Sequence, residues 1–251
     1  MPPKPTLSVL IPVFDEAPTL ERLLDAVEAR PEVTEVVIVD DGSSDGTAEI
    51  LGRRRFVKPV QIIRHAENRG KGSAVRTAIG AATGELAVIQ DADLELDPSE
   101  YARLLEPFSR PDVSAVYGAR TFHVDSLRTL WLAFGNKLVT LWTNLLFRSR
   151  IHDMETCYKL LPLGVWRSLD LQANRFDIEP EITAKLLRAG HHIVEVPISY
   201  SGRGAGEGKK LGWRDGVEAL WTLTRIRFGR AQPTGTQSRS RYTATSGPGR
   251  R

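Results

Sequence analysis

Apolar runs that end in acidic residues recur along the first hundred residues of the chain. Three such runs cover residues 7–14, 35–39 and 86–89. Each run is short enough for a buried strand, and a helical pattern follows each one. After the first run, apolar residues recur at helical spacing behind Pro18, and residues 47–51 and 73–82 favour two further helices. Strands that alternate with helices predict an α/β fold with a mostly parallel, Rossmann-like central sheet flanked by helices.

The acids at the ends of these runs are the candidate chemistry. They are Asp15 and Glu16 after the first run, Asp40 and Asp41 after the second, and Asp91 and Asp93 after the third. Ligands of parallel sheets collect beyond the carboxyl ends of the strands, which is where these acids are expected. Asp91 and Asp93 are two residues apart, so in a continuing strand they would share one face and could hold one hard cation with sites open for phosphate oxygens. A solvated turn is the alternative, because Asp favours turns.

Length and charge narrow the class of protein. A chain of 251 residues can bury a full α/β core, and we expect one domain over residues 1–228. The net charge of +3 is misleading, because five arginines and no acid lie beyond residue 228, so residues 1–228 carry −2. This distribution argues against a nucleic-acid-binding face. Residues 229–251 are rich in Gly, Ser, Thr, Pro and Arg, which predicts a disordered basic tail.

Cysteine usage and hydropathy predict a cytoplasmic protein. Cys157 is the single cysteine, which rules out an internal disulfide and fits a reducing compartment. Residues 1–5 lead directly into the first strand, so no secretory signal is expected. Cys157 itself is expected inside a strand, where packing explains it better than nucleophilic chemistry.

Seven motifs together carry a resemblance to a known family. The first four resemble family 2 glycosyltransferases of the GT-A fold, and the last three resemble polyprenyl- or dolichyl-phosphate mannose and glucose synthases. In chain order the motifs occupy residues 10–16, 39–47, 68–72, 90–95, 152–159, 176–181 and 196–200. The resemblance implies an inverting transfer of a hexose from a GDP-mannose or UDP-glucose type of donor to a polyprenyl phosphate. A glycosyltransferase with a glycan or soluble hydroxyl acceptor, and a non-catalytic nucleotide-sugar-binding protein, are the alternatives.

The resemblance also implies a metal site. Mg²⁺ or Mn²⁺ would be held by Asp91 and Asp93 and would neutralise the charge of the leaving diphosphate, which makes Asp93 an expected catalytic residue. Glu95 is expected within reach of the same ion. At that position the mannose synthases often carry Gln, so a solvated loop residue is the alternative for Glu95.

Donor recognition is expected in the nucleotide-sugar half, about residues 6–120. The family places an acid near the nucleoside at Asp40, whereas Asp41 is better explained as part of a turn and helix cap. Lys71 adds a positive charge to a helix start, which itself favours anions. The other residues expected in this pocket are Pro12, Phe14, Glu16 and Gly70.

Acceptor recognition is expected in the second half, about residues 121–228. The resemblance implies that Asp153 lies near the acceptor, as a base or as a residue that positions the acceptor. A phosphomonoester hardly needs a base, because its second pKa is about 6. Arg120 is the first candidate for binding the acceptor phosphate. Arg203 and Lys209 lie in a glycine-rich segment that could close over a diphosphate, and an exposed basic loop is the alternative.

Apolar residues at helical spacing over residues 127–145 predict a long amphipathic helix, interrupted by Lys137. The resemblance implies that this helix lies on a membrane, where Trp131 and Trp142 would suit the interface. A helix that faces the core or a dimer partner is the alternative. With no membrane span expected after Phe228, the protein is expected on the cytoplasmic face of the membrane, bound peripherally or through a membrane-protein partner.

Overall fold

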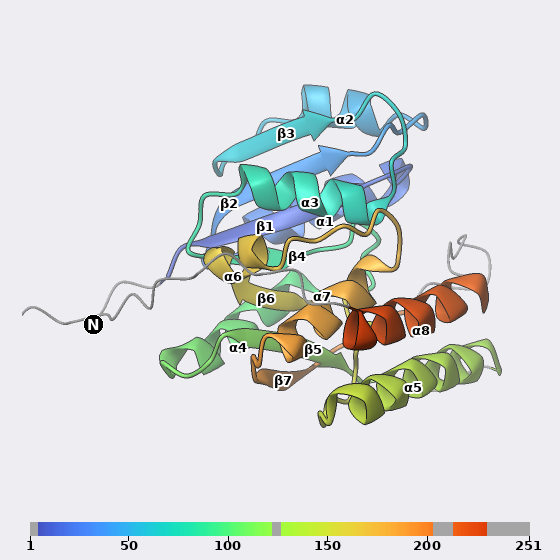
Figure 1. The fold of residues 1–251 in the computed structure, drawn as a ribbon. Coiled ribbons are helices and arrows are strands. Elements are labelled where there is room, and N and C mark those ends of the chain that lie inside the picture. The colour runs from blue at the N-terminus through green and yellow to red at the C-terminus, as the bar shows by residue number, and fades with distance from the viewer. Residues whose placement is uncertain (1–4, 122–126, 203–212, 230–251) are drawn as a thin grey trace, which may run out of the picture.

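A seven-stranded sheet forms the centre of the protein, with the order β3-β2-β1-β4-β6-β5-β7 (Figure 1). The structure is a computed structural model, and it describes residues 5–121, 127–202 and 213–229. The strands are β1 (Leu7–Val13), β2 (Val33–Asp40), β3 (Val60–Arg64), β4 (Leu86–Ile89), β5 (Ala115–Arg120), β6 (Lys159–Pro162) and β7 (Ile193–Ile198). Neighbouring strands run parallel except at β6, which is antiparallel to both β4 and β5. The predicted mostly parallel α/β sheet is confirmed.

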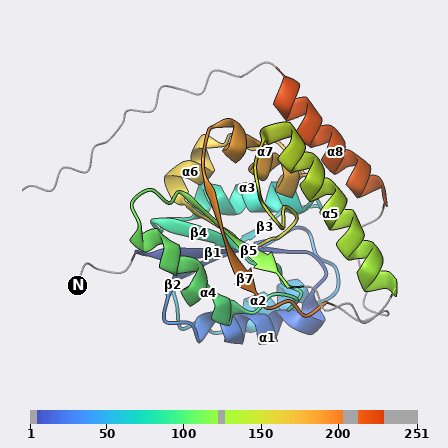
Figure 2. The same ribbon diagram turned by 90° about the horizontal axis from the view of Figure 1, so that it is seen from below.

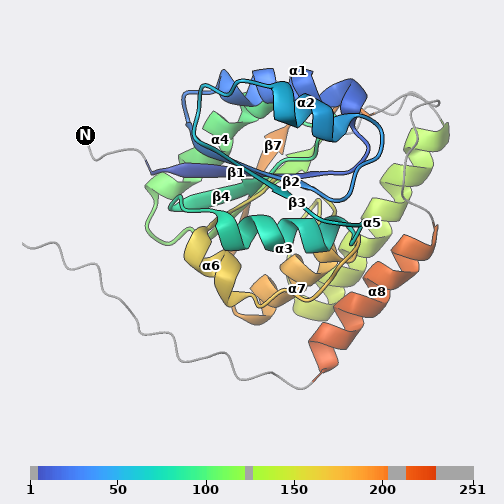
Figure 3. The same cartoon turned by 90° about the horizontal axis from the view of Figure 1, so that it is seen from above.

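Helices cover both faces of this sheet (Figures 2 and 3). One face carries α1 (Ala17–Glu28), α2 (Thr47–Arg53) and α4 (Tyr101–Leu105), with the short 3₁₀ turns η1 (Pro98–Glu100) and η2 (Glu106–Ser109) on either side of α4. The other face carries α3 (Lys71–Ala81), α6 (Leu163–Ser168) and α7 (Ile178–Arg188). Finally, α5 (Leu127–Phe147) and α8 (Trp213–Phe228) run side by side and pack outside α7.

Burial explains why these segments form strands and helices. Every residue of β1 and of β4 is buried, as expected for central strands with helices on both faces. The predicted apolar stripe of α1 is confirmed, because its buried residues are Leu20, Leu23, Leu24 and Val27. The other two predicted helices are also present, as α2 and α3.

The pairing register brings the ends of the acid-terminated strands to one edge of the sheet. β1 pairs in parallel with β2 as far as Val13 opposite Asp40, and with β4 as far as Leu10 opposite Ile89. β4 ends at Ile89, so Asp91 and Asp93 lie in the loop after the strand. The strand does not continue to these acids, so the argument from a shared strand face does not apply, and their positions depend on the loop.

The position of Cys157 and the absence of a membrane span were two further expectations. Cys157 lies just before β6 rather than inside a strand, which corrects its predicted position. It is buried, and burial raises the pKa of its thiol well above the usual range. No helix in the described part of the chain is long and apolar enough to cross a membrane. The predicted tail lies outside the described residues from residue 230 onward.

Candidate functional site

A cavity of about 410 Å³ opens at the edge of the sheet where β1 and β4 end. Its walls also include the start of α3, the loop before β6 and the start of α7. The predicted site residues that line it are Pro12, Phe14, Glu16, Gly70, Lys71, Asp91, Asp93, Glu95 and Arg120. The fold thus brings the acids expected at the metal and the arginine expected at the acceptor into one cavity. Arg203 and Lys209 lie outside the described residues.

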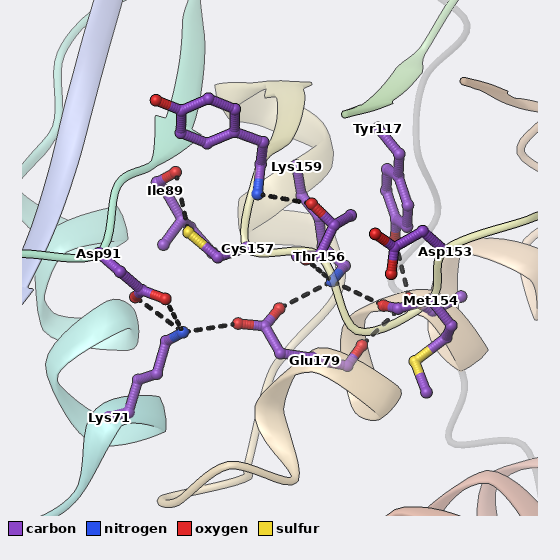
Figure 4. Close-up of polar contacts among 12 residues, drawn as sticks. Lys71, Ile89, Asp91, Tyr117, Asp153, Met154, Thr156, Cys157, Lys159 and Glu179 are labelled. Carbon is purple, nitrogen blue, oxygen red and sulfur yellow. Dashed lines mark hydrogen bonds and ion pairs between the residues drawn. The ribbon is translucent and has the colours of Figure 1, made fainter. Parts of the chain in front are cut away.

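Lys71 connects two of the acids in this cavity (Figure 4). Its Nζ lies 2.8 Å from Asp91 Oδ1 and 3.0 Å from Glu179 Oε1. Burial alone would lower the pKa of Lys71, but the two carboxylates outweigh it and raise the pKa well above its usual range. Lys71 is therefore a permanent cation at the start of α3, and its charge is directed to Asp91 and Glu179.

The three acids expected at the metal line one cavity but do not converge. Asp93 Oδ1 accepts a hydrogen bond from the backbone N–H of Glu95 (3.1 Å), and Glu95 Oε2 accepts one from the Tyr200 hydroxyl (3.0 Å). Among the described residues, no three side chains of the metal-binding types are grouped closely enough to hold an ion. A preformed three-carboxylate site is thus not present. Asp91 and Asp93 still fit Mg²⁺ or Mn²⁺, because such ions are commonly held by one or two carboxylates together with phosphates of the substrate.

The structure distinguishes the adjacent acids Asp40 and Asp41. Asp40 is buried and is not among the residues that line the cavity; its Oδ1 accepts a hydrogen bond from Ser43 N (2.9 Å), and its Oδ2 lies 3.3 Å from Arg64 Nε. Asp41 does line the cavity. Its carboxylate accepts hydrogen bonds from the backbone N–H groups of Arg69 and Gly70, so it also fixes the entry into α3. Of these two adjacent acids, Asp41 lines the cavity and Asp40 does not.

The glycines at the start of α3 are explained by a close backbone contact. A Cβ at Gly70 would collide with the carbonyl oxygen of Asn174, and one at Gly72 would collide with that of Ala173. The same Asn174 oxygen accepts a hydrogen bond from Ser73 N (3.1 Å). The helix start that was expected to favour an anion thus already has a protein oxygen against one of its N–H groups.

Arg120 and Asp153 form a bidentate ion pair. Arg120 Nε lies 2.7 Å from Asp153 Oδ2, and Nη2 lies 2.9 Å from Oδ1. Asn136 of α5 donates a third side-chain hydrogen bond to Asp153 (2.9 Å). Burial raises the pKa of Asp153, but these partners outweigh it and leave the pKa below its usual range. Asp153 is therefore arranged to orient Arg120 rather than to accept a proton, which favours the positioning role over the base.

Sequence reasoning assigned no role to a buried lysine beside this pair. Lys159 Nζ donates to the carbonyl oxygens of Met154 and Thr156 and lies 2.8 Å from Glu179 Oε2 (Figure 4). Glu179 in turn contacts Lys71. Burial raises the pKa of Glu179, but the two lysines outweigh it and lower the pKa. Lys159 and Glu179 lie in motifs that carried the family resemblance, and nothing else in the sequence pointed to these two residues.

Glu155 is a second residue that the sequence did not single out. It lines the cavity, and its Oε1 is buried without a hydrogen-bond partner in the described part of the chain. Burial raises the pKa of Glu155 to about 7; the charge on Lys159 opposes this shift and that on Glu179 adds to it. At neutral pH this carboxyl is divided between its acid and carboxylate forms.

One of the two tryptophans of the long helix α5 is hydrogen-bonded to the neighbouring helix α8. The Trp142 indole donates a hydrogen bond to the Thr224 hydroxyl (3.1 Å), so Trp142 joins α5 to α8. The side chain of Trp131 lies outside the described residues. Both helices nevertheless carry exposed apolar side chains, which we call together the α5–α8 apolar surface. Its residues are Phe134, Leu138, Leu141 and Leu145 of α5, and Val217, Trp221 and Phe228 of α8.

Comparison with known proteins places these features in a family. Residues 8–161 match the family model described as Glycosyl transferase family 2. The chain is 29% identical over 245 residues to an undecaprenyl-phosphate mannosyltransferase of Micrococcus luteus, an alignment that covers 88% of this chain and 98% of that protein. It is 29% identical over 216 residues to a dolichol-phosphate mannosyltransferase of Pyrococcus furiosus, covering 82% of this chain and only 59% of that one.

Solved structures share the fold. Glucosyl-3-phosphoglycerate synthase of Mycobacterium tuberculosis superimposes with a TM-score of 0.69 at 17% identity, over 91% of this chain and 82% of that one. Mannosyl-3-phosphoglycerate synthase of Rubrobacter xylanophilus gives a TM-score of 0.67 at 17% identity, over 93% and 79%. The mycobacterial enzyme has also been crystallised with Mn²⁺, uridine diphosphate and glucosyl-3-phosphoglycerate. At this level of identity the likeness concerns the fold, and it confirms the GT-A architecture expected from the sequence.

Proposed function

The chain belongs to glycosyl transferase family 2, and we propose that it transfers a hexose from a nucleoside-diphosphate sugar to a polyprenyl phosphate at a membrane surface. The donor is of the GDP-mannose or UDP-glucose type. The names of the Micrococcus and Pyrococcus relatives support this acceptor, because both describe transfer of mannose to a polyprenyl or dolichol phosphate.

The observation that carries the proposal is the link between the cavity and the α5–α8 apolar surface. Both helices of that surface reach the site: Asn136 of α5 donates to Asp153, and Asp215 of α8 lines the cavity. A lipid whose chain rests on the apolar surface could therefore present its phosphate to the cavity that Arg120 lines. Exposed Lys137 and Arg225 on the same helices would add attraction to an anionic membrane. This arrangement supports peripheral binding, and we place it on the cytoplasmic face, with or without a membrane-protein partner.

Several charged groups of the cavity have a place in the proposed reaction. An oxygen of the acceptor phosphate attacks the anomeric carbon while the bond from that carbon to the donor diphosphate breaks, which inverts the configuration. Arg120, held by Asp153, orients the acceptor phosphate. Asp91 and Asp93 would hold Mg²⁺ or Mn²⁺, which would supply Lewis-acid neutralisation of the leaving diphosphate. Asp41, Phe14 and Glu16 line the part of the cavity assigned to the donor.

The test is a transfer assay with liposomes that contain undecaprenyl phosphate. Purified protein is incubated with Mn²⁺ and either GDP-mannose or UDP-glucose, and lipid-linked sugar is extracted and quantified. We expect product with one donor, and the nucleotide of that donor should raise the thermal midpoint when Mn²⁺ is present. A ligand at 100 times its dissociation constant adds about 2.7 kcal/mol, which a melting curve resolves.

The matched controls for this assay are Asp91→Asn and Asp112→Asn. Asp91→Asn should abolish transfer while leaving the fold intact, whereas Asp112 lies on the exposed surface in a pair with Arg110 and its substitution should change nothing. Transfer to soluble hydroxyl acceptors without any lipid-linked product would overturn the acceptor assignment. Nucleotide binding with no transfer to either kind of acceptor would support a non-catalytic binding protein instead.

A further inference from the structure

Glu155 is a half-buried residue of the cavity wall, and one of its carboxyl oxygens is buried without a partner in the described part of the chain. It lies in the loop between α5 and β6, and the buried oxygen is Oε1. Glu179 Oε1, by contrast, is paired with the Lys71 ammonium at 3.0 Å. A buried polar atom without a partner is costly to the folded state, so a ligand group that can pair with it is favoured at that position.

The charged groups around Glu155 are already committed to one another. They are Arg120 from β5, Lys159 from β6, Glu179 from α7 and Asp153 from the same loop. Arg120 is paired with Asp153, and Lys159 is paired with Glu179. Two cations thus already face two carboxylates, and an ionised Glu155 would be a third negative charge in this group. Its neutral acid form is correspondingly favoured, and that form has an O–H to donate.

We propose that Glu155, as the neutral acid, donates a hydrogen bond to an oxygen of the acceptor phosphate and so positions it beside Arg120. This assignment rests on the proposed function. A carboxylic acid is a donor to an anionic oxygen, whereas a carboxylate would repel the same oxygen. The proton stays on Glu155 throughout, because the second pKa of a phosphomonoester, about 6, lies below that of Glu155, about 7. Glu155 is thus a positioning residue whose donor is lost as the pH rises.

The test is the pH dependence of the KM for farnesyl phosphate, a short polyprenyl phosphomonoester, between pH 6 and pH 9. In the wild type we expect the acceptor KM to rise by about tenfold or more above pH 7, while the KM for the sugar donor stays level. Glu155→Gln keeps an N–H donor at every pH, so its acceptor KM should remain low and flat. Glu155→Leu has no donor, so its acceptor KM should be high and equally flat. Glu106→Gln, on the exposed surface at the start of η2, is the matched control and should follow the wild type.

The outcomes separate this inference from the proposed function. If the wild type and Glu155→Gln transfer to farnesyl phosphate with the same pH profile, Glu155 does not donate to the acceptor and the inference alone fails. If all variants bind the donor but neither bind nor glycosylate farnesyl phosphate at any pH, the proposed function and the inference fail together. A change confined to kcat at a constant acceptor KM would also refute the positioning role.

Discussion

Lys71 and Asp91 are joined by an ion pair of 2.8 Å between α3 and the loop after β4, so a lysine neutralises one of the two carboxylates that we assign to the metal. The lysine is shared, because the same ammonium contacts Glu179 of α7 at 3.0 Å. A cation that binds Asp91 must therefore compete with Lys71, and a displaced Lys71 would retain Glu179 as its partner. Whether a cation is bound at Asp91 therefore affects where the Lys71 ammonium lies in the same cavity.

Replacing Lys71 with Met should strengthen the binding of Mn²⁺ to the protein without nucleotide. The substitution removes the competing ammonium and leaves Asp91 with its full charge, so we expect the dissociation constant for Mn²⁺ to fall several-fold. Titration followed by electron paramagnetic resonance, which detects free Mn²⁺, measures this directly. Lys137→Met, on the exposed side of α5, is the control and should leave the affinity unchanged. Weaker or equal binding in Lys71→Met would show that Lys71 does not compete with the ion.

Arg120→Ala should destabilise the protein strongly, because it leaves the buried carboxylate of Asp153 without its partner. Removing one member of a buried pair costs about 3–5 kcal/mol. Adding Asp153→Asn to the same variant removes the unpaired charge and should recover part of the loss in urea unfolding. Arg110→Ala breaks an exposed pair with Asp112 and should change stability by about 0.5 kcal/mol or less.

The pH dependence of the same pair has a definite sign. The pKa of Asp153 is lowered in the folded protein, so its stabilisation is present above the ordinary value of 3.8 and is lost as the pH falls through the lower folded value. The stability gap between the wild type and Arg120→Ala should therefore be full at pH 7 and should narrow below pH 4. A gap that stays constant down to pH 3 would mean that the ion pair contributes nothing to folding.

The α5–α8 apolar surface should bind lipid through its exposed residues and not through Trp142. Leu141 and Trp221 are 66% and 65% exposed, so changing both to Ser should reduce co-sedimentation with anionic liposomes while leaving the thermal midpoint nearly unchanged. Trp142→Phe loses the hydrogen bond to Thr224 and should lower stability by about 1 kcal/mol with lipid binding intact. Val57→Ser is the control, since Val57 is 86% exposed and lies on the opposite part of the sheet, before β3. Equal liposome binding by all variants would contradict a membrane role for this surface.

The strand-end acids could be located from the sequence because two local patterns agreed. An apolar run predicts a buried strand, and acids that follow several parallel strands must meet at one edge. That reasoning correctly brought Asp91 and Asp93 into one cavity with Pro12 and Phe14. It could not place the side chains of the loops. In a loop the local backbone conformation decides where each side chain points, and the alternation of a strand no longer applies.

Contacts between distant segments could not be predicted from the sequence. Asp41, which lines the cavity, accepts hydrogen bonds from the N–H groups of Arg69 and Gly70, nearly thirty residues away. The role of Trp142 depends on Thr224 of α8, 82 residues further on. Such contacts require the tertiary packing, and the family resemblance named the motifs without pairing their side chains.

Glu155→Gln should make the protein more stable than the wild type at neutral and alkaline pH. The pKa of Glu155 is about 7 in the folded protein and 4.5 as its ordinary value. Below pH 4.5 the folded and unfolded chains are both protonated, and Glu155 adds no dependence on pH. Between pH 4.5 and pH 7 the unfolded chain loses its proton first, so the wild type loses stability, and above pH 7 the loss levels off at on the order of 3 kcal/mol. The difference in thermal midpoint between Glu155→Gln and the wild type should therefore grow from pH 4.5 to pH 7 and then stay constant. A difference that is flat across this range would show that Glu155 ionises as an exposed acid does, and it would remove the neutral donor on which its role at the acceptor depends.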